Sequence, residues 1–191
     1  METRKNIYKL TLSAMFLAIG IILPFLTGQI QQIGNMLLPM HIPVLLCGLV
    51  CGWRYGLIIG FVLPFLRYAM FGMPVLFPTG LAMAFELATY GMAIGLFYSH
   101  SRWHCIVSLY RSMVAAMLAG RVVWAVVQML LLGIGENGFT WKMFLAGAFF
   151  NAIPGIILQL VVIPAIMVAL SRTGLVLFTK TKPEISELGN E

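Results

Sequence analysis

The sequence predicts an all-α membrane protein, a six-transmembrane-helix bundle with both termini cytoplasmic. Of its 191 residues, 61% are hydrophobic and only 9% are charged. The mean hydropathy of +0.97 is too high for a soluble globular domain. The apolar residues also fall into six stretches, and a helix of about 20 residues is enough to cross a bilayer. Little chain is left over, so we expect residues 1–191 to form a single integral membrane domain.

The first apolar stretch, residues 7–27, follows Arg4 and Lys5 and has Lys9 near its start. A basic start before an apolar run is also typical of a secretory signal. No small-x-small cleavage site follows cleanly, and the run is long. We therefore interpret the stretch as a first transmembrane helix.

The second and third stretches, residues 37–53 and 55–71, are separated only by a Gly-Trp-Arg-Tyr-Gly turn at residues 52–56. Glycines at both ends of so short a connection favour a sharp reversal of the chain. The two stretches are therefore expected to form a tight antiparallel hairpin.

The last three stretches are residues 79–98, 105–134 and 141–171. The last two of these are longer than a bilayer requires, so we expect them to tilt or to extend into water. The polar composition of residues 176–191 predicts a loosely held tail.

The orientation follows from the lysines and arginines in short loops, which are retained on the cytoplasmic side. With both termini inside, nine of these residues are cytoplasmic and only Lys142 lies outside. The nine are Arg4, Lys5, Lys9, Arg54, Arg102, Arg111, Arg172, Lys180 and Lys182. This asymmetry accounts for the net charge of +6, and no nucleic-acid partner is needed to explain it.

The three cysteines, Cys47, Cys51 and Cys105, lie in apolar surroundings. Cys47 and Cys51 share a helical face, but two thiols without further ligands make a poor zinc site. We interpret all three as packing residues and expect neither a metal nor another cofactor.

Three ionisable residues, Arg67, Glu86 and Arg121, lie inside apolar stretches. Ionisable groups at membrane depth are costly and usually face a cavity or a partner. The predicted topology places all three in the outer half of the membrane or at its middle. A ligand pocket open to the outside is therefore expected where they converge.

Other polar and aromatic residues fall at a similar depth. Trp124 and Gln128 share a helical face with Arg121, and Asn151 lies about ten residues into the last stretch. Tyr68 follows Arg67, and His41 stands between two prolines, which predicts an irregular start of its helix. Irregular backbone at this depth is tolerated where it lines a cavity.

Charge counting leaves two interpretations of these residues open. In the first interpretation, Glu86 pairs with one arginine only to fix helix packing, as buried ion pairs often do. In the second, Glu86 belongs to the ligand pocket. In both cases two arginines against one glutamate leave one positive charge, which an anionic ligand would balance. The planar fork of arginine matches a carboxylate, so a monocarboxylate fits the count.

The chain lacks a Gly-rich Walker loop, the common hydrolase motifs and any aspartate. ATP hydrolysis by this chain alone is therefore excluded. An intramembrane enzyme using Glu86 and His41 as acid and base, or a purely structural subunit, stands as an alternative. The favoured interpretation is a protein that binds or moves a ligand with borrowed energy.

Several segments resemble the substrate-binding S components of energy-coupling factor (ECF) vitamin transporters. They are residues 38–56, Leu-Pro-Met-His-Ile-Pro-Val-Leu-Leu-Cys-Gly-Leu-Val-Cys-Gly-Trp-Arg-Tyr-Gly, the run Gly-Phe-Val-Leu-Pro-Phe from residue 60, Met-Pro-Val-Leu-Phe-Pro at 73–78, and Phe-Glu-Leu-Ala-Thr-Tyr-Gly at 85–91.

The resemblance implies a multi-pass protein of the bacterial cell membrane that binds a vitamin in the outer half of a six-helix bundle. It also implies docking through an Ala-x-x-x-Ala motif, here Ala14 and Ala18, onto a transmembrane coupling protein driven by two ATPases. Because one positive charge is in excess, we expect pantothenate as the substrate. The loop after the first helix and the 71–78 connection are expected to close over it. Folate or another anionic vitamin-like compound is the second choice.

Overall fold

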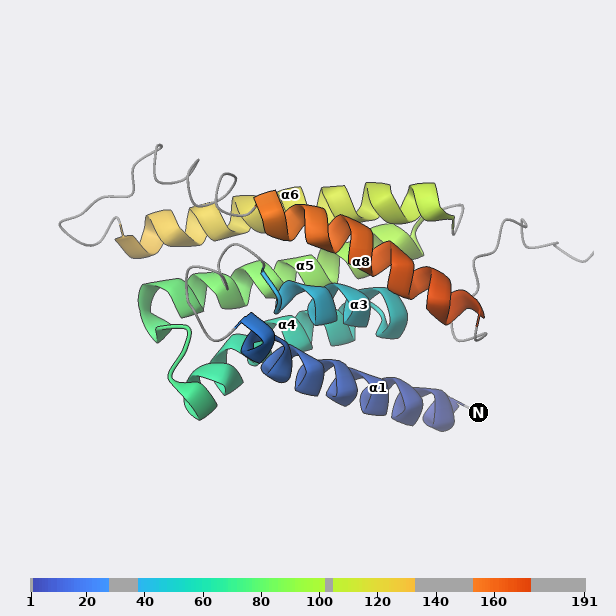
Figure 1. Ribbon diagram of the computed structural model, residues 1–191, viewed down its shortest axis with the longest axis horizontal. Helices are drawn as coiled ribbons and strands as arrows, with labels where there is room; N and C mark the ends of the chain where they lie inside the picture. Colours follow the sequence, from blue (N-terminus) through green and yellow to red (C-terminus); the bar gives the residue numbers. More distant parts are fainter. Residues whose placement is uncertain (1, 28–37, 102–104, 133–152, 173–191) are drawn as a thin grey trace, which may run out of the picture.

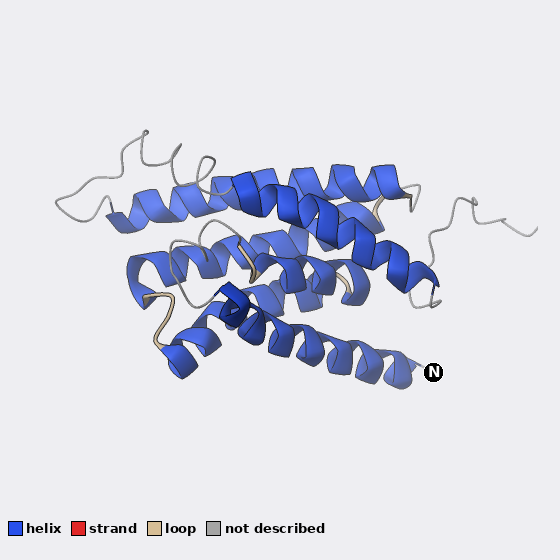
Figure 2. Cartoon of the chain, viewed as in Figure 1, coloured by secondary structure: helices blue, strands red, loops and turns tan. Residues whose placement is uncertain are grey.

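The computed structural model describes residues 2–27, 38–101, 105–132 and 153–172, and these parts are helical apart from short connections (Figures 1 and 2). The elements are α1 (Glu2–Ile22), the 3₁₀ turn η1 (Leu23–Thr27), α3 (His41–Cys51), α4 (Trp53–Phe71), the π turn η2 (Leu76–Gly80), α5 (Leu81–Ser99), α6 (Ile106–Leu132) and α8 (Ile153–Arg172). The helices lie side by side as a bundle.

Helix α3 forms the centre of the bundle. Ten of its eleven residues are buried, and it packs against α1, α4, α5 and α8. It begins at His41, whose amide donates to the carbonyl of Leu38 at 3.0 Å, and Leu38 has a φ of +48°. The irregular start predicted here is therefore confirmed. The predicted bounds 37–53 were too wide, because this turn at one end and Gly52 at the other leave a helix only about 16 Å long.

The predicted hairpin between the second and third stretches is confirmed, but its turn is shorter than five residues. Only Gly52 interrupts the helices, with a φ of +101° that a residue with a side chain rarely adopts. The residues from Trp53 onwards already belong to α4. Gly56 then packs so closely on Gly91 of α5 that a Cβ at either position would overlap the other backbone.

Five helices are long and apolar enough to cross a membrane: α1, α4, α5 with its preceding turn η2, α6 and α8. Helix α3 is apolar but shorter. The predicted sixth stretch started at residue 141, whereas α8 begins at Ile153, and residues 133–152 lie outside the described parts, as does the tail 176–191. Six crossings therefore remain a prediction.

The connection from α4 to α5 contains Gly72, with a φ of +69°, and two cis peptide bonds, Met73-Pro74 and Phe77-Pro78. The fourth stretch was predicted from residue 79, but the chain there still belongs to η2, and α5 begins at Leu81. The side chain of Phe77 is exposed.

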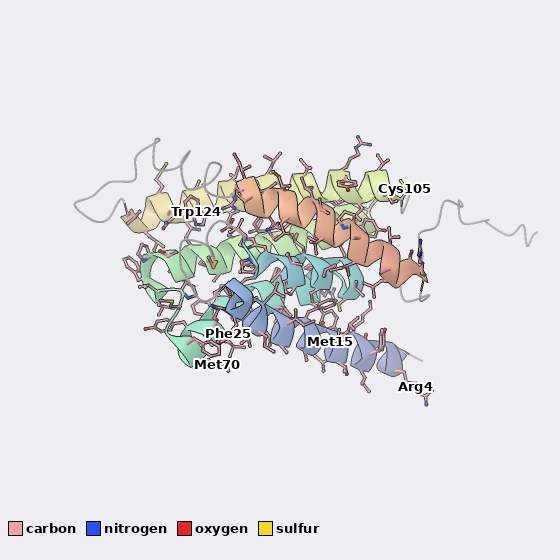
Figure 3. The ribbon with its side chains drawn as sticks, in the orientation of Figure 1. Arg4, Met15, Phe25, Met70, Cys105 and Trp124 are labelled. Carbon is pink, nitrogen blue, oxygen red and sulfur yellow. The ribbon has the colours of Figure 1, made fainter. Side chains whose placement is uncertain are left out.

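The exposed basic residues of the described parts gather at one end of the bundle, hereafter the basic end. Arg4 and Lys9 lie near the start of α1, Arg54 near the start of α4, Arg111 near the start of α6, and Arg172 is the last residue of α8. Figure 1 shows these helix termini on one side of the molecule, and Figure 3 places Arg4 there. This arrangement fits the predicted orientation, although which side faces the cytoplasm remains a prediction.

Candidate functional site

A buried carboxylate joins three helices in the half of the bundle away from the basic end. Glu86, on α5, is only 2% exposed. Its Oε1 lies 3.0 Å from Nη1 of Arg121 on α6 and 3.7 Å from Nε2 of His41 at the start of α3. The first distance is that of a close ion pair, whereas the second is too long for a hydrogen bond. Glu86 and Arg121 thus form the charged centre of the site.

Tyr90 supports this centre from one turn further along α5. Its buried ring meets the ring of His41 edge to face, with the centroids 5.0 Å apart. On the α6 side, a Cβ at Gly120 would lie 2.8 Å from the Tyr90 ring. The absence of a side chain at Gly120 therefore lets α6 approach α5 closely enough for the adjacent Arg121 to reach Glu86.

Several buried polar atoms have no hydrogen-bond partner within the described parts of the chain. They include Oε1 of Glu86, both ring nitrogens of His41, Nε and Nη2 of Arg121, Oε1 of Gln128 and Nε2 of Gln159. Buried polar groups in native proteins nearly always find a partner, from the protein, from water or from a ligand. These atoms come from α3, α5, α6 and α8, so the buried sides of those helices carry both donors and acceptors.

The unpaired atoms of Arg121 are adjacent on its guanidinium group. Nη1 faces Glu86, while Nε and Nη2 together form the other edge of the planar fork. Two parallel N–H groups of this kind match the two oxygens of a carboxylate. Arg121 thus faces Glu86 on one side, and its other, bidentate edge is free of partners among the described residues.

Arg67 does not take part in this pair. It lies on α4, is 5% exposed, and its Nη1 donates to the backbone carbonyl of Ile21 near the end of α1 at 3.3 Å. In the described residues, both charged contacts of Glu86 come from Arg121 and His41. The sequence pattern predicts that the ionisable residues converge, and among the described residues Arg67 makes no ion pair with Glu86.

The other predicted site residues lie as follows. Gln128 is buried on α6, and Trp124, between it and Arg121, is half-buried (Figure 3). Tyr68 is 40% exposed. Asn151 lies outside the described residues.

Gln159, on α8, was missed from the sequence although it is only 1% exposed. Two other amide side chains, Gln128 and Asn151, were predicted as site residues from the sequence, but Gln159 was not. Gln159 is nevertheless the one polar residue in the run from Ile153 to Leu170, and a polar residue at membrane depth is usually functional or paired. That signal would have found it.

The two alanines of the predicted docking motif lie apart from the site, on α1. Ala14 and Ala18 are both exposed, whereas Ser13, Phe16 and Gly20 of the same helix are buried. The described helices of this chain therefore leave the alanine face of α1 exposed. Small residues on such a face allow close approach of another helix.

The chain was compared with known proteins. A family model described as the substrate-specific component of ECF transporters matches residues 8–167. Neither the curated proteins nor the solved structures gave a match. The matched range includes Ala14, Ala18 and the whole buried cluster of Glu86, Arg121 and His41, and it covers most of the 191 residues. The chain belongs to the ECF transporter substrate-specific component family.

Proposed function

We propose that this chain binds a small vitamin-type monocarboxylate, with pantothenate as the first choice, and delivers it for uptake through an ECF transporter. Membership of the family makes the chain a component of a transporter. The identity of the substrate is the new part of the proposal.

The free edge of Arg121 is the observation that carries this choice. A carboxylate held by Nε and Nη2 would satisfy two buried donors that otherwise have no partner in the described residues. It would also balance the charge, because Arg67, Arg121 and Glu86 together leave one positive charge among the buried groups. Glu86 holds the guanidinium in place for this contact.

The uncharged polar groups favour a ligand with amide and hydroxyl groups. Gln128 offers an unpaired acceptor and Gln159 an unpaired donor, and the His41 ring can donate or accept. Pantothenate carries one carboxylate, one amide and two hydroxyls. Folate carries two carboxylates, for which Arg121 has one free edge, and thiamine is a cation that would favour carboxylates instead.

The remaining predicted residues are assigned supporting roles. Trp124, next to Arg121 on α6, would enclose the ligand, and Asn151 would add a further amide from the last helix. The loop after α1 and the connection containing Pro74 and Pro78 would close over the occupied site.

The transport partners would be those of the ECF module, a transmembrane coupling protein and two ATPases. The chain lacks an ATP-binding motif of its own, so the energy comes from them. Ala14 and Ala18, exposed on α1, would form the contact with the coupling protein. In this proposal the chain crosses the bacterial cell membrane six times, both termini are cytoplasmic, and the site opens to the outside.

The direct test is calorimetric titration of the purified protein in detergent with pantothenate and with pantothenol, in which an alcohol replaces the carboxylate. Pantothenate should bind saturably and pantothenol at least about thirtyfold more weakly, since a charge-assisted contact is lost. Equal binding of the two would show that the carboxylate is not recognised.

The matched variants are Arg121→Gln and Arg111→Gln, which remove the same charge from the same helix. Arg111 is exposed near the basic end, so its variant should bind like the unmodified protein. Arg121→Gln should weaken pantothenate binding by at least about thirtyfold. If folate, riboflavin, thiamine or biotin binds instead, the choice of pantothenate is wrong. If none of these five vitamins, pantothenate included, binds the protein or shifts its melting temperature, the buried ion pair has only a packing role.

A further inference from the structure

An apolar groove runs along the outside of the bundle, between α1, α3 and α8. Its volume is about 570 Å³, and its lining side chains are all apolar. They include Phe16 and Ile19 of α1, Leu46 of α3, and Val162 and Ile166 of α8. Because the groove offers no hydrogen-bonding side chain, its occupant must be apolar where it lies between these helices.

The groove is distinct from the alanine face of α1. Leu12, Phe16 and Ile19 line the groove, whereas Ala14 and Ala18 point about 140° away from it, since successive residues of a helix differ by about 100°. A partner that packs on the alanines therefore does not by itself fill the groove.

The length of the groove matches one leaflet of a bilayer. Its lining extends from Leu12 of α1 to Leu23, the first residue of η1, a rise of about 16 Å at about 1.5 Å per residue. The hydrocarbon core of a membrane is about 30 Å thick, so half of it is about 15 Å. One acyl chain of a phospholipid has this reach.

Two basic residues, Lys9 and Arg172, stand within one helical turn of the lining residues at one end of the groove. Leu12 of α1 and Leu170 of α8 are the lining residues nearest the basic end. Lys9 precedes Leu12 by three residues and Arg172 follows Leu170 by two, and both basic side chains are exposed. Basic sites between transmembrane helices at the membrane surface attract anionic lipid headgroups.

We propose that the groove is a binding site for an anionic phospholipid, with an acyl chain between α1, α3 and α8 and its phosphate paired with Lys9 and Arg172. The apolar lining, the length of one leaflet and the two cations near one end together favour a lipid over a helix of a partner protein. The proposal does not depend on which vitamin the chain carries.

The test is native mass spectrometry of the full chain in detergent, with phosphatidylglycerol and phosphatidylcholine added at equal concentration. Phosphatidylglycerol should remain bound preferentially. The double variant Lys9→Gln/Arg172→Gln should reduce its retention by about thirtyfold, because two surface cations are removed. The control Arg54→Gln/Arg111→Gln removes two charges at the same end but away from the groove, and it should retain the lipid.

A second pair of variants tests the apolar part of the site. Val162 lines the groove, whereas its neighbour Val161 is exposed on another face of α8. Val162→Trp should fill the groove and reduce lipid retention by about tenfold, and Val161→Trp should leave it unchanged. If Val162→Trp does not fold, the charge variants, which leave the bundle interior intact, decide the question.

Three results would overturn the proposal. One is equal retention of the two lipids by the unmodified protein. Another is equal retention of phosphatidylglycerol by the two double charge variants. The third is a Val162→Trp variant that keeps the lipid but loses co-purification with the coupling protein, because the groove would then be a contact for that protein.

Discussion

Two buried arginines lie in the same half of the bundle and have different partners. Arg121 faces a carboxylate at 3.0 Å and keeps two unpaired nitrogens. Arg67 donates to a backbone carbonyl at 3.3 Å. The two residues are equally well buried, so burial alone does not distinguish a ligand contact from a structural one.

The partner of Arg67 explains its position without a ligand. Ile21 lies in the last turn of α1, where the chain passes into the 3₁₀ turn η1. Carbonyl groups at the C-terminal end of a helix have lost their regular partners, and a cation there is favoured by the helix dipole. Arg67 therefore acts as a cap that ties the end of α1 to α4.

The two arginines differ in two properties: one carries the excess positive charge, and the other carries the hydrogen-bond donors that lack a partner in the described residues. The formal excess of one positive charge is located at Arg67, which has no carboxylate partner among the described residues. The unsatisfied hydrogen-bond donors are located on Arg121. An anionic ligand is attracted by the first and is held by the second, so the two arginines are expected to respond differently to substitution.

The largest effect is expected for Glu86→Gln. This variant keeps the shape of the side chain but leaves Arg121 as an uncompensated buried charge, so the free energy of unfolding should fall by about 3–5 kcal/mol. The double variant Glu86→Gln/Arg121→Gln should recover most of this loss. Denaturant unfolding in detergent measures both, and a loss below about 1 kcal/mol for Glu86→Gln would mean that the pair is screened by water.

A smaller effect is expected for Arg67→Gln. Loss of the cap should lower the free energy of unfolding by about 1–2 kcal/mol and increase amide hydrogen exchange in the last turn of α1. Affinity for pantothenate should change less than about threefold, a difference of under 1 kcal/mol.

The matched control is Arg54→Gln. Arg54 lies on the same helix, at the basic end, with its guanidinium over the Trp53 ring at 5.3 Å. Its variant should leave exchange in α1 unchanged. If Arg67→Gln instead weakens pantothenate binding by at least about thirtyfold, as is expected for Arg121→Gln, then Arg67 contacts the ligand and the distinction between the two arginines fails.

The helical bundle could be predicted from the sequence because the length and spacing of apolar runs are local properties. The bounds of α3 were predicted less well. Its ends depend on the positive φ of Leu38 and of Gly52, and a leucine in that conformation has no sequence signature. Apolar length alone does not distinguish helix from the turn beside it.

The ion pair at Glu86 could be predicted as an alternative, but its partner could not. Helix α5 packs against both α4 and α6, so either arginine was available. The choice depends on how α5 is rotated. A Cβ at Gly60 would overlap the backbone of α5 at Leu87, so α4 and α5 touch through backbone there, next to Glu86, and leave little room for an ion pair on that side.

The smallest effect on stability is expected for Gln159→Leu, and it tests the unpaired groups around Arg121. Replacing a buried donor without a partner by an apolar side chain of similar size should leave the free energy of unfolding unchanged or raise it by up to about 1 kcal/mol. Pantothenate binding should weaken about fivefold to tenfold, because the ligand loses one hydrogen bond. Val161→Leu, on the exposed face of the same helix, should change neither quantity.

Opposite changes in stability and affinity are what identify a binding residue in this experiment. A packing residue would lose stability when it is replaced, and its effect on affinity would follow from that loss. If Gln159→Leu lowers the free energy of unfolding by more than about 1 kcal/mol, then Nε2 has a partner inside the protein. In that case Gln159, like Arg67, has its hydrogen-bond partner inside the protein and does not contact the ligand. The ligand site is then confined to the edge of Arg121 that faces away from Glu86.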